Sequence, residues 1–439
     1  MQRILMDKLL EWKDDLYRKP LFLQGIKHSG KTYLLKQFGE KYFKSVLYFD
    51  FSGDANLADL FGQSSDPRTI LKNLSIYLEK DIRPDETLII LDEVHLCPAA
   101  LESLRHFCDK AKEYHIASAA SFPAVSTPKG TSIPIGKVEL LTLYPMNFYE
   151  FLLAQSPMLA LHLKESGFEG DPHRTFKKQL ADRFRDFQIV GGMPEAVECF
   201  VSSGSIEAVN TLQSQIIKSF ESELATRCPA NMLPKLLAVL NAIPAQLAKD
   251  NKKFMFSKVK KSWRGKDLDD AVYLLMRAGL IHKIMHIEKP EIPVSAHANP
   301  AHFKLYFCDV GLLRQIGQFP AAMIFSRENT SMNIKSAIAE NIVCNELVRA
   351  YEKELYYWSA ENPRKAEVDF IVFDGGEFIP IEVKAGSASK ARSLLQFRMR
   401  FNPNKSVLTG MDNDKDDILP LYCFWNFGEW LRRKPRLNA

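Results

Sequence analysis

Short apolar runs alternate with amphipathic stretches along the first third of the chain. The stretches between the runs place apolar residues at helical spacing, as Leu34, Leu35 and Phe38 do. Because strands that alternate with helices form parallel sheets with right-handed crossovers, the pattern predicts an α/β domain. A ligand of such a sheet is expected at the carboxyl ends of its strands. The expected strands are residues 20–23, 45–51, 87–91, 115–121 and 138–143.

The loop after the first apolar run has the spacing G-x-x-x-x-G-K-[ST]. Between a strand and a helix, this spacing lets successive backbone N–H groups face a phosphate, and the helix N-terminus adds its dipole. Lys31 is expected to reach the β- and γ-phosphates, and Thr32 to offer its hydroxyl to Mg²⁺. The alternative is a plain glycine-rich turn. The predicted nucleotide-binding residues here are Gly25, Ile26, Lys27, His28, Ser29, Gly30, Lys31, Thr32 and Tyr33.

Two adjacent carboxylates, Asp92 and Glu93, end the third apolar run. Asp92 is expected to hold a water bound to Mg²⁺, and Glu93 to orient or deprotonate the attacking water. Taken alone, acids after a strand would also suit the N-terminal cap of a helix. Together with the phosphate loop they predict a site that binds ATP or GTP and hydrolyses it.

Composition places the chain among soluble globular proteins. Its 439 residues suggest two to four domains, and 46% of them are hydrophobic and 25% charged. The net charge of +5 permits a nucleic-acid partner without demanding one. Seven cysteines without a C-x-x-C pair argue against a disulfide framework or a zinc site. Neither a signal peptide nor a long apolar run occurs, so the expected location is cytoplasmic, with no membrane.

A different pattern begins after residue 230. Three expected helices, 233–247, 257–263 and 268–278, precede a hairpin whose first strand is 281–287, and this order resembles a winged helix-turn-helix. Seven basic residues and no acid lie between 252 and 266. On a recognition helix they would meet DNA phosphates; the alternative is a solvated helix face. The seven are Lys252, Lys253, Lys258, Lys260, Lys261, Arg264 and Lys266.

The last part of the chain contains a second group of acids. Glu340 lies on an expected helix over 334–351, and Asp369 lies on the first strand of an expected hairpin with a turn at 374–376. Glu382 and Lys384 are two apart on the return strand and therefore project from one face. This order resembles the PD-(D/E)XK nuclease fold.

By that resemblance, Glu340, Asp369 and Glu382 would bind Mg²⁺ through oxygen ligands. Lys384 would position or activate water, so that Asp369, Glu382 and Lys384 form the expected catalytic group. Surface alternation along the strands is the alternative origin of these residues.

Blocks along nearly the whole chain also resemble the prokaryotic AAA-type ATPases that carry a C-terminal domain of unknown function. They include RKPLFLQGIKHSGKT, TLIILDEVHLCPAALESLRHF, GGMPEAV, FKLYFCDVGLL, IAENIVCNELVRAYEKELYYW and IPIEVKAG. The resemblance implies that Ser121 takes the sensor position near the γ-phosphate, although a strand-end cap is the alternative. It also implies that Pro194, in Gly191-Gly192-Met193-Pro194, lies against the bound nucleotide.

The sequence thus predicts a multidomain α/β protein in four parts. These are a P-loop AAA-type core (1–154), a helical lid (155–230), a winged-helix-like domain (231–325) and a PD-(D/E)XK nuclease-like module (326–439). The expected function is ATP binding and hydrolysis coupled to DNA, with Mg²⁺-dependent DNA cleavage as its furthest extension. The alternative is an ATP-gated DNA- or protein-binding switch with a vestigial nuclease fold. An oligomer is left open.

Overall fold

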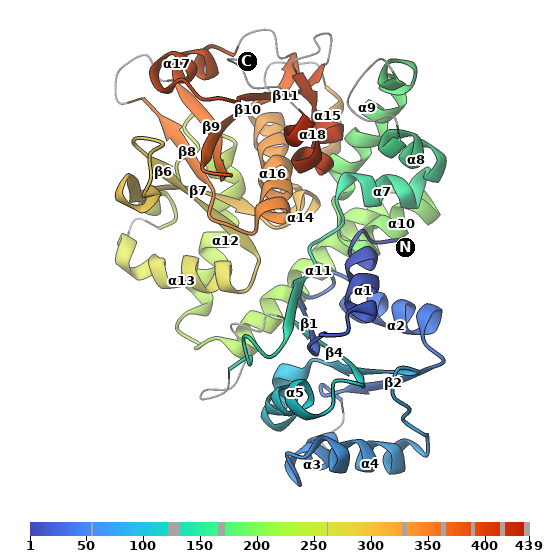
Figure 1. The fold of residues 1–439 in the computed structure, drawn as a ribbon. Helices are drawn as coiled ribbons and strands as arrows, with labels where there is room; N and C mark the ends of the chain where they lie inside the picture. The colour runs from blue at the N-terminus through green and yellow to red at the C-terminus, as the bar shows by residue number, and fades with distance from the viewer. Residues whose placement is uncertain are drawn as a thin grey trace. The chain divides into compact units, whose positions relative to one another are not determined.

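The computed structural model describes the chain apart from residues 54–55, 122–131, 166–171, 261, 327–331, 361–365, 388–390, 413–417 and 434–439. It divides into two compact units. Unit 1 contains Met1–Pro145 with two short pieces, Thr226–Cys228 and Arg277–Gly279, and unit 2 contains the remainder. Each unit has its own sheet (Figure 1).

The sheet of unit 1 has the strand order β2-β3-β4-β1-β5, and all of its pairings are parallel. The predicted parallel α/β domain is therefore confirmed. Every residue of β3 is buried, as in a strand that helices cover on both faces. The strands are β1 (Leu21–Gly25), β2 (Ser45–Asp50), β3 (Thr87–Asp92), β4 (His115–Ser121) and β5 (Glu139–Thr142).

Helices cover both faces of this sheet (Figure 1). On one face, Leu9 and Phe38 pack with Leu88 of β3 in one buried cluster. On the other face, Leu74 and Leu104 pack with residues of β2 and β3. The helices are α1 (Leu5–Asp14) and α2 (Lys31–Tyr42) on the first face, and α3 (Asn56–Gly62), α4 (Pro67–Leu78) and α5 (Pro98–Lys110) on the second.

The register of the strands decides which residues meet at the carboxyl edge of the sheet. Gly25 at the end of β1 is paired with Ser121 at the end of β4. Asp92 at the end of β3 is paired with Asp50 of β2. Four strands that are separated in the sequence therefore end at one edge, where a ligand of a parallel sheet is expected.

Unit 2 begins with a group of helices (Figure 1). The helix α7 starts with a capping box, in which Asn147 and Glu150 each accept a hydrogen bond from the other's backbone N–H. Helix α7 had been expected within the core domain 1–154, and it belongs instead to unit 2. The helices are α7 (Phe148–Gln155), α8 (Pro157–Glu165), α9 (Pro172–Val190), α10 (Pro194–Ser203), α11 (Ile206–Arg227), α12 (Leu233–Leu247) and α13 (Gly265–Arg277).

The sheet of unit 2 has the strand order β12-β11-β10-β9-β8-β6-β7. Its central hairpin joins β9 to β10 antiparallel, as predicted, with Gly375 and Gly376 at positive φ in the turn. Helix α16 packs against β10. The strands are β6 (Ile281–Ile287), β7 (Ala298–Phe307), β8 (Tyr356–Ser359), β9 (Glu367–Asp374), β10 (Glu377–Ser387), β11 (Val407–Asp412) and β12 (Ile418–Pro420). The remaining helices are α14 (Val310–Ile316), α15 (Ala321–Phe325), α16 (Met332–Tyr351), α17 (Arg392–Phe401) and α18 (Phe427–Arg433).

Two expectations for residues 231–325 are wrong. The hairpin β6–β7 is not a separate wing, because Met285 of β6 pairs with Tyr356 of β8 and the hairpin forms one edge of the large sheet. The expected boundary at 325–326 therefore falls inside one sheet. The expected helix 257–263 is only a short 3-10 turn, Phe256–Lys258. Pairing between distant strands leaves no local pattern in a sequence, which is why the boundary was misplaced.

The glycines of the Gly-Gly-Met-Pro element are explained by close packing within unit 2. The N–H of Gly192 donates to Asp309 Oδ2 at 2.6 Å, and the Gly192 carbonyl accepts from the N–H of Met146 at 2.6 Å. A Cβ on Gly192 would lie 1.9 Å from the Met146 carbonyl oxygen. Gly191 has φ +73°, in the left-handed region that favours glycine. Asp309 also caps α14 through the N–H of Leu312.

We expect Gly192→Ala to destabilise unit 2, because the added methyl would collide with backbone rather than with a movable side chain. Overpacking of this kind costs about 3 kcal/mol or more. Gly428→Ala is the matched control, since a Cβ there would meet no atom within 4 Å. The midpoint of urea unfolding measures both variants. Equal midpoints for Gly192→Ala and Gly428→Ala would contradict the packing role of Gly192.

Candidate functional site

The phosphate loop joins β1 to α2 in unit 1. Gly25 must be glycine, because a Cβ there would lie 2.3 Å from the Leu143 carbonyl oxygen. Gly30 and His28 have φ values of +92° and +64°, so the loop turns through the left-handed region twice. This curl leaves no side-chain cap on the first turn of α2. The N-terminus of α2 therefore keeps N–H groups for an anion.

Lys31 is the first residue of α2 and only 5% exposed. Its Nζ donates to the carbonyls of Gly25 and Ile26, at 3.1 and 3.0 Å, and to Ser121 Oγ at 2.8 Å. Burial lowers the pKa of Lys31 to about 8, against the opposing effect of Glu93 and Asp92. A phosphate group would supply the negative charge that this buried ammonium favours.

Thr32 and Asp92 are brought together at the edge of the sheet. Thr32 Oγ1 donates to Asp92 Oδ2 at 2.5 Å. Burial raises the pKa of Asp92, while the hydrogen bond from Thr32 works against that rise. A hydroxyl and a carboxylate are hard oxygen donors of the kind that Mg²⁺ takes together with nucleotide phosphates. The residues present therefore fit both ATP and Mg²⁺.

Glu93 lies next to this pair in a strained backbone conformation, with φ 50° and ψ 37°. Its carboxylate accepts from Ser121 twice, from Oγ at 2.6 Å and from the backbone N–H at 3.0 Å. The Ser121 hydroxyl thus accepts from Lys31 and donates to Glu93. The expected sensor residue is linked both to the phosphate-binding lysine and to the expected general base.

Sequence reasoning missed three residues around this site. Tyr48, on β2, donates to Asp92 Oδ2 at 3.0 Å. The buried guanidinium of Arg3 donates to the carbonyls of Ser29 and Tyr144, at 2.8 and 2.6 Å. Arg3 thereby links the phosphate loop to the segment around Tyr144. His95 Nδ1 lies 3.4 Å from Glu93 Oε2. Tyr48 lies on β2, the strand that pairs with β3. Its place on an expected neighbouring strand is the one feature of the sequence that could have pointed to Tyr48.

The other residues predicted to bind the nucleotide differ in burial, and one of them lies in unit 2. Ile26 and Ser29 are buried in the loop, and Lys27 is half-buried. Tyr33 is 55% exposed on α2. Pro194 begins α10 in unit 2, so its contact with a nucleotide of unit 1 stays a prediction.

The acids expected to form a nuclease site are buried in unit 2, where protein groups already occupy most of their oxygens. Glu340 Oε1 accepts from Lys252 and from Ser336, and Glu340 Oε2 accepts from Tyr306 at 3.0 Å. Asp369 Oδ2 accepts from the N–H of Val383 at 2.8 Å.

Two lysines complete this group. Lys384 donates to Glu382 Oε1 at 2.5 Å. Lys304 Nζ forms an ion pair with Glu367 and lies 3.9 Å from Asp369 Oδ1.

These neighbours set the charges of the acids. Burial would raise the pKa of Glu340, but Lys252 and Lys304 outweigh it and hold that pKa below its usual value. Burial, with Glu340 and Glu382 nearby, raises the pKa of Asp369 well above its usual value. A metal ligand must be deprotonated, and a cation at Glu340 would have to displace the Lys252 ammonium.

Glu340 therefore offers no free oxygen to a divalent cation, whereas Glu382 Oε2 is buried without a hydrogen-bond partner among the described residues. Across the described parts of the chain, no three His, Cys, Asp or Glu side chains converge to hold a metal ion. Of the predicted Mg²⁺ ligands, Glu340 is closed to a metal ion by protein donors, and the roles of Asp369 and Glu382 stay predictions. The sequence did not reveal that the segments of Lys252 and Lys304 approach these acids.

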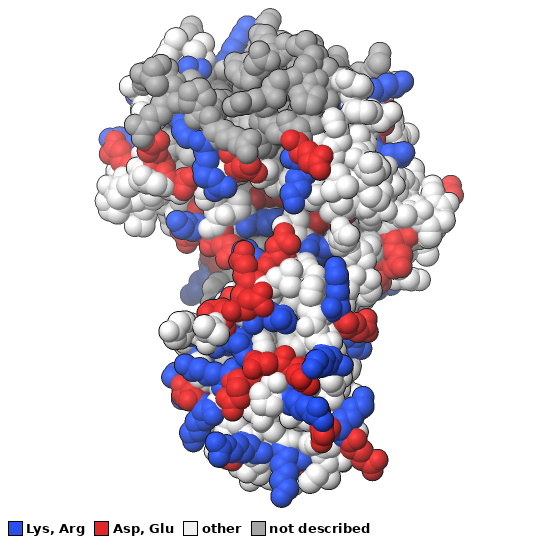
Figure 2. Space-filling model, turned by 45° about the vertical axis from the view of Figure 1, so that its right-hand side comes forward, with Lys and Arg blue, Asp and Glu red and all other residues white. Residues whose placement is uncertain are grey.

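The basic segment 252–266 is not a recognition helix. Lys252 is buried against Glu340, so it is not available to a phosphate. Lys258, Lys260, Arg264 and Lys266 are exposed, and Lys260 lies over the ring of Trp263 at 4.4 Å. Lys261 lies outside the described residues. The face of the molecule drawn in Figure 2 carries interspersed cations and anions.

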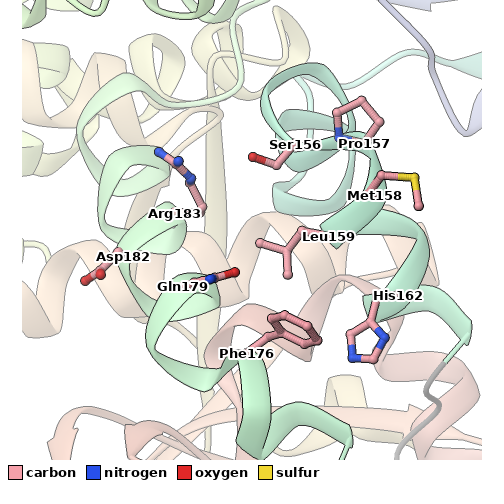
Figure 3. A pocket seen from close by; sticks show the side chains of 9 residues that line it. All are labelled: Ser156, Pro157, Met158, Leu159, His162, Phe176, Gln179, Asp182 and Arg183. Carbon is pink, nitrogen blue, oxygen red and sulfur yellow. The ribbon is translucent and has the colours of Figure 1, made fainter.

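A cleft of about 850 Å³ lies between α8 and α9 in unit 2. Figure 3 shows Met158 and His162 on one side of it and Gln179 and Arg183 on the other. Arg183 is also paired with Asp186 at 3.3 Å. None of the predicted site residues lines this cleft.

Two of the family matches lie mainly in unit 2. Residues 181–323 match a domain of unknown function, DUF8612, and residues 335–424 match another, DUF4143. None of the curated proteins that were compared with the chain matches it. None of the described helices is long and apolar enough to cross a membrane.

Several solved structures are similar to the chain. The Walker-type ATPase of Pyrococcus abyssi has 12% identity over 71% of this chain and 94% of its own, with a TM-score of 0.41. The Aeropyrum pernix ORC1 protein in complex with DNA has 12% identity over 74% and 95%, with a TM-score of 0.28. The AMPPCP-bound DnaA of Aquifex aeolicus has 15% identity over 61% and 75%, with a TM-score of 0.27.

Because these TM-scores are below 0.5, the assignment rests on the chain's own residues and on its family match. Residues 17–152 match the AAA domain family, and this range contains the phosphate loop, Asp92, Glu93 and Ser121. The sheet order and the contacts around Lys31 agree with that match. The N-terminal part of this chain is therefore similar to AAA domains that carry a phosphate loop.

Proposed function

We propose that the protein is an ATP-hydrolysing switch whose chemistry lies in unit 1. The observation that carries the proposal is the hydrogen-bonded chain Lys31–Ser121–Glu93 beside the Thr32–Asp92 pair. These residues lie at one sheet edge, where they would serve as a phosphate-binding cation, a general base and a pair of magnesium ligands. An ATP hydrolase requires these groups together.

Each residue has a distinct part in the proposed reaction. The N–H groups at the start of α2 and the Lys31 ammonium bind the β- and γ-phosphates. Thr32 and Asp92 hold Mg²⁺, which neutralises charge that develops on the phosphate oxygens when it is bound. Glu93 accepts a proton from the attacking water, and Ser121 orients the Glu93 carboxylate toward that task.

The proposed partner is DNA, bound through the exposed cations Lys258, Lys260, Arg264 and Lys266. They support the proposal because no acid interrupts residues 252–266 and because backbone phosphates are recognised mainly by such charges. The second candidate is a protein partner. Cytoplasmic location, oligomer formation and a nucleotide contact of Pro194 remain predictions. DNA cleavage is not part of the proposal, because protein donors already occupy both oxygens of Glu340.

Substitutions at Lys31 and Glu93 test the ATP site. We expect Lys31→Ala to abolish binding of labelled ATP, because it removes the buried counter-charge. Glu93→Gln should keep ATP binding and lose roughly 100-fold or more in turnover, since an amide accepts no proton. Lys44→Ala and Glu102→Gln, two substitutions on the surface of the same unit, are the controls. Wild-type turnover in Glu93→Gln would show that Glu93 is not the base.

Tyr48→Phe tests the residue that sequence reasoning missed. It removes only the hydroxyl that donates to Asp92. We expect the Mg²⁺ concentration for half-maximal ATP turnover to rise about 10-fold, as is usual when a group that orients a metal ligand is lost. Tyr17→Phe, at an 83% exposed side chain of the same unit, is the control. An unchanged Mg²⁺ dependence would mean that Tyr48 does not position Asp92.

The salt dependence of DNA binding tests the partner. Replacing Lys258, Lys260 and Lys266 together by Ala should flatten the slope of log affinity against log salt by up to about three units. A triple alanine variant at Lys41, Lys72 and Lys80, exposed on unit 1, is the matched control. Equal slopes in the two variants would exclude the segment as a phosphate contact. Absence of DNA binding by the wild type would favour a protein partner.

A further inference from the structure

Unit 2 contains a cluster of buried charges to which no part in the ATPase reaction is assigned. Its acids are Glu340 on α16, Glu367 and Asp369 on β9, and Glu382 on β10. Glu340 is 1% exposed and Glu382 is 3% exposed. Carboxylates so far from water are strongly destabilising unless positive charges and hydrogen bonds compensate them.

The compensating cations come from segments that precede the acids in the sequence. Lys252 lies between α12 and the 3-10 turn Phe256–Lys258, and Lys304 lies on β7. Lys252 is buried, and its Nζ donates to Glu340 and, at 2.7 Å, to Ser336 Oγ. Lys304 is fully buried and pairs with Glu367. Neither lysine belongs to the region 335–424 that matches a family of its own.

Protein donors leave little room for a metal at Glu340. Lys252 and Ser336 donate to one carboxylate oxygen, and Tyr306 donates to the other. A divalent cation would have to displace these donors and leave the Lys252 ammonium buried without its partner, which is itself costly.

Charge counting supports the same conclusion. The cluster contains four carboxyl groups and three lysines, Lys252, Lys304 and Lys384. The raised pKa of Asp369 is the response of a buried acid that two other acids surround. Each of the four carboxyl groups has an ammonium group within 4 Å: Lys252 at Glu340, Lys304 at Glu367 and Asp369, and Lys384 at Glu382.

We infer that Lys252 and Lys304 are the counter-ions of this cluster and that it is a metal-independent ion-pair core rather than a nuclease centre. The core joins the segments around residues 252 and 304 to α16, β9 and β10. This inference does not depend on the proposed ATPase function.

The inference has a consequence for the extent of the folding unit. The strand β8 pairs with β6, which lies outside the region 335–424. Without residues 252–307, β8 would lose this pairing and Glu340 would lose Lys252 and Tyr306. The smallest unit that satisfies the buried acids therefore includes residues 252–307 together with the C-terminal strands and α16.

A double-mutant cycle in the full-length protein tests the pairing of Lys252 with Glu340. Lys252→Met and Glu340→Gln should each lower the Tm of unit 2 by an amount on the order of 10 °C, because each leaves a buried partner unpaired. The double variant should lose less than the sum of the two. Lys253→Met and Glu352→Gln are the neighbouring controls. Additive losses in the double variant would overturn the pairing.

Titration of the nucleotide-free wild-type protein with Mn²⁺ tests the second half of the inference and requires no variant to fold. We expect no calorimetric binding and no rise in Tm at millimolar Mn²⁺. Binding that Asp369→Asn abolishes would overturn the metal-independent core. Asp369→Asn is a suitable probe, since the amide removes the carboxylate but keeps an oxygen that can accept from the N–H of Val383.

Discussion

The Ser121 hydroxyl is the group on which the arrangement of the nucleotide site depends. It accepts a hydrogen bond from Lys31 and donates one to Glu93, so a single side chain joins the phosphate loop to the end of β3. All three residues lie at the carboxyl edge of one parallel sheet. Because Lys31 and Glu93 are held by the same hydroxyl, movement of the lysine toward a phosphate would also change the surroundings of the proposed base.

The same site stores conformational strain. Glu93 and His28 both have positive φ without being glycine, a conformation that costs of order 1–3 kcal/mol at each residue. Such a cost persists only where surrounding contacts impose it. At Glu93 these contacts are the two hydrogen bonds from Ser121. These hydrogen bonds fix the orientation of the Glu93 carboxylate. A general base needs such a fixed orientation toward the attacking water.

The buried carboxylates of unit 2 have different hydrogen-bond donors from those of unit 1. One lysine and two hydroxyls donate to the carboxylate of Glu340, whereas the donors to Asp92 in unit 1 are uncharged: the hydroxyls of Thr32 and Tyr48 and the N–H of Glu93. Two clusters of acids that look alike as motifs thus differ in chemistry. What separates them is the partner of the buried ammonium, since Lys252 donates directly to a carboxylate whereas Lys31 donates to backbone carbonyls and to Ser121.

The amino-acid sequence by itself determined the local features of this protein. Alternating apolar runs established the parallel sheet of unit 1, and the spacing from Gly25 to Thr32 located the phosphate loop, because these features depend on residues that are close in the chain. Only the tertiary structure decided that β6 pairs with β8, that Tyr48 donates a hydrogen bond to Asp92, and that Lys252 forms an ion pair with Glu340. These contacts join residues tens of positions apart. Their physical basis is strand pairing and charge compensation in a folded interior, and neither leaves a periodic pattern in the sequence.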